Sequence, residues 1–599
     1  MHLFTVCILL LSLFNIGSAI AASTKTTTLS MSNDAHKIDA SLEFSHDSIV
    51  YYKLRNQAKS LTRDGNFKEA LPLLLKLAEQ YQNDGEIWYL LGIAQRQLQD
   101  FRAAIHSFKQ ALVLGVRVHG IKGNSSNPND LMVTIARLYA QLDEEAETKY
   151  WLTKALNHRW DDKPKLAGTS LFTKGADQHF AQFHQKSWYQ DLVGVARSFK
   201  NPVEGWRYDL AYLVAEINRL HANPFHSVTE IEFNAKVEAI YSEIPGLTDS
   251  QIVFEFMRLL AMVNNGHNFF VPAWGKKGNF TQLPMQFYQF RDGLYIVAAN
   301  DEYQQYIGHK VTKFNGLDTV DVLKMTDAVN AKDNTMQRLW QGPYYLSLLP
   351  VLEGLGVFNE HDPLTLTLLS PKGVVIDIKP QSQKMNFNGF PKLPKLGKKQ
   401  LTPLYLQNVT TAYFDKVFLK QQSLYVQFNQ VQNTQGESLK DFNIRLQQRL
   451  LSKEVKHFIL DLRHNSGGNG SLLAPMIKTA VLFESLNPDG KFFIIAGRNT
   501  YSAGHDLLVR LLEVTDPIIV GEPSGTRPNT IGEAGWFTLP YSGQKGIISS
   551  QFHQKSSAED HRIWIAPDMP ITLDADDYFN GNDIALDTIF EYISHQAKR

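Results

Sequence analysis

The clearest hydrophobic pattern lies between residues 456 and 527, where short apolar runs alternate with segments of helical periodicity. The runs predict strands at 458–463, 492–496 and 517–520, and the periodic segments predict helices at 472–483 and 507–512. Strands that alternate with helices of this length favour βαβ units and a parallel sheet. Functional groups of such sheets gather at the carboxyl ends of the strands. The turns that follow the runs are therefore the first place to look for chemistry.

Two of these turns suit acyl transfer. Ser502 lies where the second run passes into a helix, and a helix N-terminus favours developing negative charge. The glycine turn after the first run brings backbone N–H groups toward the same edge of the sheet. We expect Gly467 or Gly468, together with Ala503, to form an oxyanion hole. The alternative is that the glycines form only a tight turn and that Ser502 only caps a helix.

The residues around these turns resemble a known family. Residues 461–468, Asp-Leu-Arg-His-Asn-Ser-Gly-Gly, resemble the Asp-Leu-Arg-x-Asn-x-Gly-Gly signature of the tail-specific (C-terminal processing) and tricorn-core serine peptidases. Ser502-Ala503, followed 19 residues later by Gly521-Glu522, resembles the family's nucleophile segment, and Pro567-Asp568 resembles its closing Pro-Asp. The resemblance covers roughly residues 200–575. It implies a ClpP/crotonase-like α/β fold with Ser502 as nucleophile.

His267 is the candidate general base. It follows the helix predicted at 252–263, within Asn-Asn-Gly-His-Asn, where members of the family often carry Asp-Gly-His-Thr. A neutral imidazole can take the proton of a serine hydroxyl near pH 7. The alternative is a solvated histidine beyond a helix that Gly266 caps.

The third catalytic group in this family is a lysine or an acid. Members with a Ser-Lys dyad place the lysine 25 residues after the serine, but that position holds Arg527, which stays protonated and cannot act as a base. The tricorn-core variant uses serine, histidine and a late acid, for which Asp560, and after it Glu559, are the candidates here. Either acid could instead pair with Arg562 at the surface. Arg527 then becomes a candidate to bind a substrate carboxylate.

Residues 50–160 contain an internal repeat. Ala70 and Ala104 lie 34 residues apart, and the same spacing relates Leu54 to Trp88, Ala58 to Gly92, Leu74 to Phe108 and Leu77 to Ala111. The block from Trp88 to Ala111 resembles the tetratricopeptide repeat, which predicts an all-α solenoid of paired helices. Its concave face either binds a partner protein or serves only as a brace for the rest of the chain.

The segments between the repeats and the catalytic region follow from composition and pattern. Residues 161–200 are polar and irregular and predict a linker, and 201–283 predict the helical part of the peptidase. Residues 284–386 are rich in strand patterns, in an order that resembles the family's PDZ-like module, with an insertion at 330–360. A plain β-rich extension is the alternative. Residues 387–599 are assigned to the catalytic α/β domain.

Residues 1–22 have the pattern of a secretory signal. The apolar run from Leu3 to Phe14 is too short to span a bilayer and is followed by small residues that predict cleavage before Ala22. A buried N-terminal strand or helix is the alternative. The only cysteine, Cys7, lies in this segment, so we expect a mature chain without disulfides. Residues 23–49 are rich in Ser, Thr and Asp and predict a flexible leader.

Composition argues against several functional classes. Lysine plus arginine and aspartate plus glutamate both number 60 in the 599 residues, so the formal net charge is zero. A nucleic-acid-binding protein usually shows a basic excess. The 19 histidines do not gather at metal-ligand spacing, so we expect neither a metal nor a cofactor. After the N-terminal run, no apolar stretch is long enough for a membrane span.

The expectations together describe a multidomain periplasmic or extracellular protein. An all-α tetratricopeptide-like solenoid precedes an α/β serine peptidase domain with a β-rich, PDZ-like insert. The expected substrate is a polypeptide, cleaved by an endopeptidase or a carboxyl-terminal processing peptidase with a Ser-His-acid site. The alternative is a catalytically inactive scaffold that binds peptides or partner proteins through its repeats.

Overall fold

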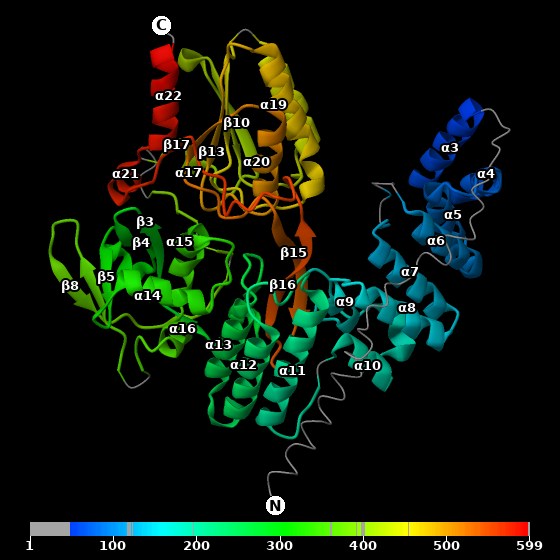
Figure 1. Ribbon diagram of the computed structural model, residues 1–599, viewed down its shortest axis with the longest axis horizontal. Coiled ribbons are helices and arrows are strands. Elements are labelled where there is room, and N and C mark those ends of the chain that lie inside the picture. Colours follow the sequence, from blue (N-terminus) through cyan, green and yellow to red (C-terminus); the bar gives the residue numbers. More distant parts are fainter. Residues whose placement is uncertain are drawn as a thin grey trace, which may run out of the picture. The chain divides into compact units, whose positions relative to one another are not determined.

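The computed structural model describes residues 48–116, 121, 124–195, 197–359, 362–387, 389–390, 392–396, 402–452 and 454–596. The chain divides into two compact units (Figure 1). The first contains the residues before Arg197 together with Val214–Leu220, and the second contains Arg197–Leu213 and His221–Arg599. The expected signal peptide at 1–22 lies outside the described residues, and so does the expected leader as far as residue 47.

In the described part of the first unit, six helices follow one another in three contacting pairs. They are α3 (Ser48–Arg63), α4 (Phe67–Gln80), α5 (Gly85–Gln97), α6 (Phe101–Leu114), α7 (Pro128–Gln141) and α8 (Glu145–Asn157). α4 and α6 begin 34 residues apart, at Phe67 and Phe101, as the repeat predicts. A Cβ on Gly92 would lie 2.6 Å from the Phe108 ring, so the small residue lets α5 and α6 approach closely. The paired helices are present, and a peptide-binding solenoid remains a prediction.

The predicted linker at 161–200 is wrong for most of that segment. It contains α9 (Lys163–Ala167), the 3-10 helix η1 (Gln178–Phe183) and α10 (Ser187–Val193). Phe180, Phe183 and Tyr189 are at most 2% exposed and join the core of the repeat helices. These elements are short and their apolar residues are widely spaced. Their sequence therefore resembles that of a polar loop.

A buried ion pair ties α9 to the second part of α11 (Pro202–Leu220), the part that belongs to the first unit. Lys163 Nζ donates to Glu216 Oε1 at 2.7 Å, and Arg219 Nη2 donates to Glu216 Oε2 at 2.7 Å. Although burial opposes the effect, Arg219 and Lys163 lower the pKa of Glu216 to about 2. Since α11 contributes residues to both units, the predicted boundary at residue 200 divides the first unit.

The second unit is organised around a six-stranded sheet. In spatial order the strands are β10 (Tyr413–Phe418), β11 (Ser423–Phe428), β12 (His457–Asp461), β13 (Phe492–Ala496), β14 (Ile518–Gly521) and β17 (Met569–Pro570). Neighbours from β11 to β17 pair in parallel, and β10 pairs antiparallel with β11. β12, β13 and β14 are the strands expected from the three apolar runs, which confirms the predicted βαβ core.

Helices cover both faces of this sheet (Figure 1). They are α18 (Leu439–Leu450), α19 (Ala474–Leu486), α20 (Ala503–Val514) and α22 (Ile584–Gln596). α18, α19 and α20 pack on one face, with Phe458 and Leu460 of β12. α22 packs on the other face, with Ile459 of β12 and Phe493 of β13. Because both faces are covered, successive strand residues are all buried, which explains the unbroken apolar runs.

Two other parts of the second unit adjoin the carboxyl ends of these strands. α12 (Glu230–Glu243) and α13 (Asp249–Met262) lead into the segment that holds His267. β15 (Thr530–Thr538) and β16 (Lys545–His553) form a hairpin that also pairs with β1 (Phe269–Phe270). This hairpin was not predicted, because its residues alternate between buried and exposed only in part.

The β-rich segment forms a sheet of its own. Its strands are β3 (Met285–Phe290), β4 (Gly293–Ala299), β5 (Lys310–Phe314), β6 (Leu317–Asp318), β7 (Leu366–Leu369) and β8 (Val375–Ile378), with helices α14 (Thr319–Met325), α15 (Thr335–Tyr345) and α16 (Leu349–Gly354). The remaining strands and α-helices of the described residues are β2 (Thr281–Gln282), β9 (Gln383–Lys384), α17 (Leu404–Gln407) and α21 (Ala575–Asn580). The expected hairpin is β7–β8. The likeness to a PDZ module remains a prediction.

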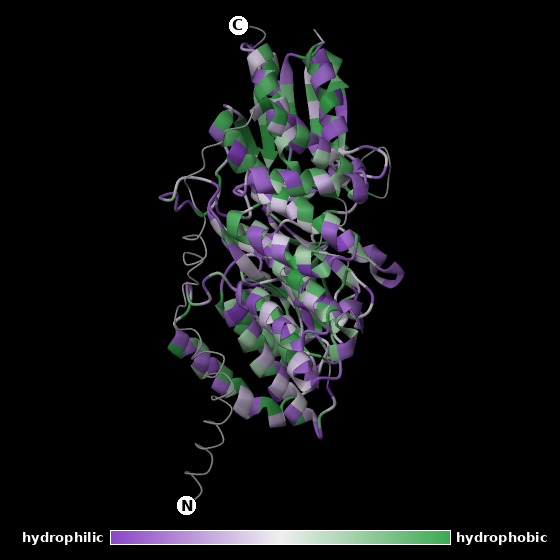
Figure 2. Cartoon of the chain, turned by 90° about the vertical axis from the view of Figure 1, so that its right-hand side faces the viewer, coloured by the Kyte–Doolittle hydropathy of each residue, from purple (hydrophilic) through white to green (hydrophobic). Residues whose placement is uncertain are grey.

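The helices carry apolar and polar residues together. Figure 2 shows purple, hydrophilic residues interrupting the green, hydrophobic ones along the helices. This mixture is typical of helices that bury one stripe in a core. Within the residues described, no helix is both long and apolar enough to cross a bilayer.

The buried pair in the first unit predicts a stability effect. Lys163→Met would leave Glu216 buried with Arg219 as its remaining charged partner, so we expect a loss of about 3 kcal/mol in the free energy of unfolding. The measurement is urea denaturation followed by far-UV circular dichroism. Lys165→Met is the matched control, because Lys165 pairs with Asp162 at 3.7 Å on the surface and such pairs contribute about 0–1 kcal/mol. Equal stability of the two variants would contradict the prediction.

Candidate active site

Ser502 sits in a strained turn between β13 and α20. Its backbone has φ 52° and ψ −129°, a region that non-glycine residues rarely occupy. The surrounding turn holds this conformation. Tyr501 N–H donates to Asn465 O at 3.0 Å, and Thr500 Oγ1 donates to Leu462 O at 2.9 Å. A serine on a sharp strand-to-helix turn has the geometry of a nucleophile elbow, which lifts its hydroxyl above the sheet.

The glycine turn after β12 lies directly against this serine. A Cβ on Gly467 would lie 2.6 Å from Ser502 Cβ and 3.1 Å from Ser502 Oγ, and the φ of Gly467 is +107°. Both the space and the backbone conformation therefore require glycine. Asn465 fixes the turn, because its Oδ1 accepts from Gly467 N–H at 3.0 Å and its Nδ2 donates to Phe428 O at 2.8 Å.

The hydrogen bonds of this turn distinguish the two glycines that were expected at the oxyanion hole. The N–H of Gly467 is committed to Asn465 Oδ1. Among the described residues, the N–H groups of Gly468 and Ala503 donate to no protein acceptor. Ala503 N would lie 3.0 Å from a Cβ on Gly467, so the start of α20 and the glycine turn adjoin. Of the three N–H groups expected at the oxyanion hole, those of Gly468 and Ala503 are thus the two without a protein acceptor in the described residues.

His267 adjoins the nucleophile turn through Tyr501. The two rings stack with centroids 4.4 Å apart and an interplanar angle of 23°. Tyr501 Oη donates to Gly266 O at 2.7 Å, and His267 N–H donates to Asn265 Oδ1 at 3.2 Å. Within the described part of the chain, no hydrogen bond joins Ser502 Oγ to the imidazole. Such bonds often form only when substrate binds.

Gly266 does not cap the preceding helix, contrary to the sequence-based expectation. α13 ends at Met262 with Val263 as its C-cap. Gly266 is instead required by close packing, since a Cβ there would lie 2.4 Å from the Gln337 amide. The helix therefore ends without help from a left-handed residue, and the glycine serves the contact with α15.

The surroundings of His267 keep its imidazole neutral. The residue is 9% exposed, and burial, assisted by Lys555 and His553, lowers its pKa to about 3. A neutral imidazole at physiological pH can accept a proton. Among the described residues, Nδ1 of His267 has no hydrogen-bond partner.

The expected acids do not contact this imidazole. The Asp560 carboxylate accepts from Arg562 Nε at 2.9 Å, from Arg562 Nη2 at 2.7 Å and from Arg562 N–H at 3.1 Å. These bonds hold the pKa of the Asp560 carboxyl well below its usual value. Glu559 is exposed. Asp560 was expected either to orient the imidazole or to pair with Arg562, and in the structure it pairs with Arg562. The guanidinium, two residues away, binds the carboxylate through two of its nitrogens.

Asp333 contacts both the segment that holds His267 and Arg527. Arg527 Nε donates to Asp333 O at 3.0 Å. The Asp333 carboxylate accepts from Gly266 N–H at 2.9 Å and from Thr526 Oγ1 at 2.9 Å. Asp333 was missed in the sequence, because a single aspartate within a presumed insertion carries no local signal of a contact 67 residues away.

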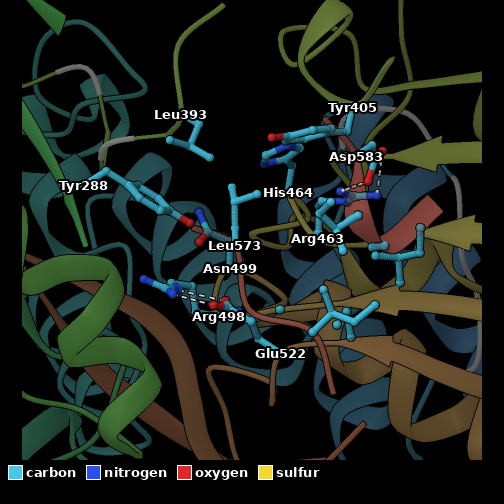
Figure 3. Close-up of a pocket in the computed structure, with 17 residues that line it drawn as sticks. Tyr288, Leu393, Tyr405, Arg463, His464, Arg498, Asn499, Glu522, Leu573 and Asp583 are labelled. Carbon is cyan, nitrogen blue, oxygen red and sulfur yellow. Dashed lines mark hydrogen bonds and ion pairs between the residues drawn. The ribbon is translucent and has the colours of Figure 1, made fainter. Parts of the chain in front are cut away.

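A small cavity lies at the carboxyl ends of the strands but not at the serine. It has a volume of about 80 Å³ and is bordered by two ion pairs, Arg498–Glu522 and Arg463–Asp583 (Figure 3). The other residues that line it are Tyr288, Leu393, Tyr405, His464, Ile495, Ala496, Gly497, Asn499, Gly521, Ile571, Leu573, Ile584 and Ala585. Several belong to the face covered by α22. Because neither Ser502 nor His267 lines it, the strained serine marks the candidate site and the cavity does not.

Comparison with known proteins gives distant structural matches. No protein-family model and no curated protein matches the chain. The structure of mature CPAF complexed with lactacystin is 11% identical, with a TM-score of 0.49, over 65% of this chain and 98% of that one. The photosystem II D1 C-terminal processing protease is 12% identical, with a TM-score of 0.31, over 63% and 98%. The tricorn protease is 12% identical, with a TM-score of 0.31, over 66% and 37%. At such values, what this chain does has to be inferred from its own site.

The contact between the two turns predicts the effect of one methyl group. Gly467→Ala would push the Ser502 side chain aside, and a displacement near 1 Å costs about 100-fold in reactivity. We therefore expect the rate at which a fluorophosphonate labels Ser502 to fall by about that factor. Gly470→Ala is the matched control, since its Cβ would lie 3.6 Å from the nearest atom, Asp506 Oδ2. Labelling of Gly467→Ala at the wild-type rate would show that the turn does not support the nucleophile.

Proposed function

We propose that this chain is a serine peptidase that cleaves polypeptides with Ser502 as nucleophile and His267 as general base. The strained backbone of Ser502, with Gly467 packed against it, carries the proposal. Such strain persists only where the surrounding structure over-determines it, and it gathers at functional sites. The stacking of His267 on Tyr501 adds a neutral base beside the same turn.

The chemical steps follow from these positions. His267 accepts the proton of Ser502 Oγ as that oxygen bonds to the scissile carbonyl carbon. The carbonyl oxygen takes up the negative charge, which the N–H groups of Gly468 and Ala503 and the N-terminus of α20 stabilise. The imidazolium then protonates the leaving amine and the C–N bond breaks. Water, deprotonated by His267, hydrolyses the acyl-enzyme and restores the serine.

We assign Asp560, and failing it Glu559, to orient the imidazole. Nδ1 of His267 has no partner among the described residues, so a carboxylate has a place to bind there. Asp560 would have to exchange its bonds with Arg562 for this contact. Turnover of Asp560→Asn and Glu559→Gln distinguishes the two, because only the loss of the orienting acid lowers it.

Arg527 is proposed to bind the substrate, and the N-terminal segment indicates where the enzyme is located. Arg527 is anchored through Nε to Asp333 O, and we assign its guanidinium to a carboxylate of the polypeptide substrate. If this is right, Arg527→Ala weakens the cleavage of peptides and leaves a small ester unaffected. From the expected signal at 1–22, we propose a location in the periplasm or outside the cell. The paired helices of the first unit would then offer a surface for a partner protein.

One observation favours a second function. Ser502 and His267 share no hydrogen bond in the described structure, as expected for an inactive scaffold that binds peptides or partners. Covalent chemistry separates the two functions, because only an enzyme reacts at Ser502 with a fluorophosphonate.

The proposal predicts that two variants lose activity together. Ser502→Ala and His267→Ala should each abolish peptide hydrolysis to a similar extent, because nucleophile and base act as a unit. Turnover of a peptide and of a small activated ester, with peptide mapping of the labelled serine, measures this. Circular dichroism of both variants serves as the control for folding. Wild-type protein that is folded but unlabelled at Ser502 would favour the scaffold.

The lowered pKa of His267 predicts an unusual pH dependence. Protonated imidazole cannot accept the serine proton, so activity is lost as the pH falls through the pKa. Because that pKa is about 3 in place of the ordinary 6.5, kcat/KM should stay nearly constant from pH 7 to about pH 5. Tryptophan fluorescence at each pH confirms that the protein remains folded. A fall in kcat/KM centred near pH 6.5 in folded protein would show that the imidazole is not held neutral.

A further inference from the structure

The backbone of Gly266, the residue before His267, is held on both sides by residues distant in the sequence. Its N–H donates to Asp333 Oδ1 at 2.9 Å. Its carbonyl oxygen accepts from Tyr501 Oη at 2.7 Å and from Gln337 Nε2 at 3.4 Å. Tyr501 immediately precedes the nucleophile, whereas Asp333 and Gln337 belong to the segment between the β-rich module's strands. The backbone of the base is therefore fixed between the serine turn and this module.

Asp333 is built into the centre of this arrangement. It is 6% exposed, and its second carboxylate oxygen accepts from Thr526 Oγ1 at 2.9 Å and from Thr530 Oγ1 at 3.2 Å. Its carbonyl oxygen accepts from Arg527 Nε at 3.0 Å. One side chain thus joins the base segment to residues 526–530, which follow β14. A buried carboxylate without such donors would be costly, and here every oxygen has one.

Neighbouring residues lock the same contact. Asn334 Nδ2 donates to Ser524 O at 3.1 Å and to Ile563 O at 2.8 Å. The Gln337 amide packs against Gly266 so closely that a Cβ on Gly266 would lie 2.4 Å from it. Asp333 N–H also donates to Gln337 Oε1. These contacts therefore hold the segment from Asp333 to Gln337 in a fixed position against both Gly266 and residues 524–530.

We propose that Asp333 is a positioning residue that fixes the backbone of Gly266, and through it the imidazole of His267, relative to Ser502. This inference rests on the proposed peptidase function, in which His267 is the base. Asp333 touches neither the substrate nor the reacting atoms, and it acts only through the backbone of the base. General-base catalysis depends on placement within about 0.5 Å, and a misplacement of 1 Å can cost about 100-fold.

Asp333→Ala and Asp333→Asn test the role of the accepted hydrogen bond. Alanine leaves Gly266 N–H without an acceptor, so kcat on a small activated ester should fall about 10- to 100-fold, while KM stays within about twofold because uniform binding is untouched. Asparagine keeps an oxygen for Gly266 N–H, and it should retain most of the wild-type kcat. Asp327→Asn is the matched control. Asp327 lies nearby in the sequence but pairs with Arg338, Nε to Oδ1 at 2.8 Å, and should behave as wild type.

A second pair of variants keeps the test decisive if Asp333→Ala does not fold. Gly266→Ala introduces the clash with Gln337, so it should lower kcat in the same way. The double variant Gly266→Ala, Gln337→Ala removes the clashing amide and should recover kcat at least in part. Recovery in the double variant supports the positioning role, and its absence overturns it.

Fluorophosphonate labelling separates the failure of this inference from the failure of the proposed function. If the wild-type protein is not labelled at Ser502, the peptidase proposal fails. If the wild type is labelled and folded Asp333→Ala reacts at the same rate, only the positioning role of Asp333 is overturned. A fall in kcat that is equal for the alanine and asparagine variants would also overturn it, since the bond to Gly266 would then not be the cause.

Discussion

The contact between the glycine turn after β12 and the serine turn after β13 is the constraint on which the site depends. Ser502 holds a positive φ because hydrogen bonds from Tyr501 and Thr500 to the neighbouring turn fix the chain between β13 and the serine. The neighbouring turn can come this close only because Gly467 has no side chain. Parallel pairing of β12 with β13 brings the two turns to the same edge of the sheet. The packing of the sheet and its helices therefore determines how closely the glycine turn approaches Ser502.

His267 is held beside this serine turn by a different set of contacts. His267 follows a helix outside the parallel sheet, and its position comes from stacking on Tyr501 and from the bonds on either side of Gly266. The acceptor for Gly266 N–H lies 67 residues further along the chain, on a segment attached to the β-rich module. Ser502 is thus positioned by contacts between successive βαβ units, and His267 by contacts between parts that are far apart in the sequence.

This difference explains what could be predicted from the sequence. The strands around 458–463 and 492–496 and the serine turn were predictable, because apolar runs and glycine turns are local signals. The hydrogen bond that occupies the N–H of Gly467 was not, since it depends on the side chain of Asn465. Asp333 left no pattern, because its role comes only from tertiary contacts. The short helices of 161–195 were missed because three buried aromatic residues pack against repeat helices that the segment itself does not reveal.

Burial of neutral histidines in the second unit couples its unfolding to proton uptake. Burial lowers the pKa of His267 and of His464 to about 3, and that of His457 to about 4. The unfolded chain binds a proton at each of these histidines near pH 6.5, whereas the folded chain does not. As the pH falls from 6.5 toward these lowered values, unfolding therefore takes up protons, and each wholly buried imidazole disfavours the native state by about 1.4 kcal/mol per pH unit. In an acidifying compartment, the second unit would therefore lose stability before the imidazole of His267 became protonated.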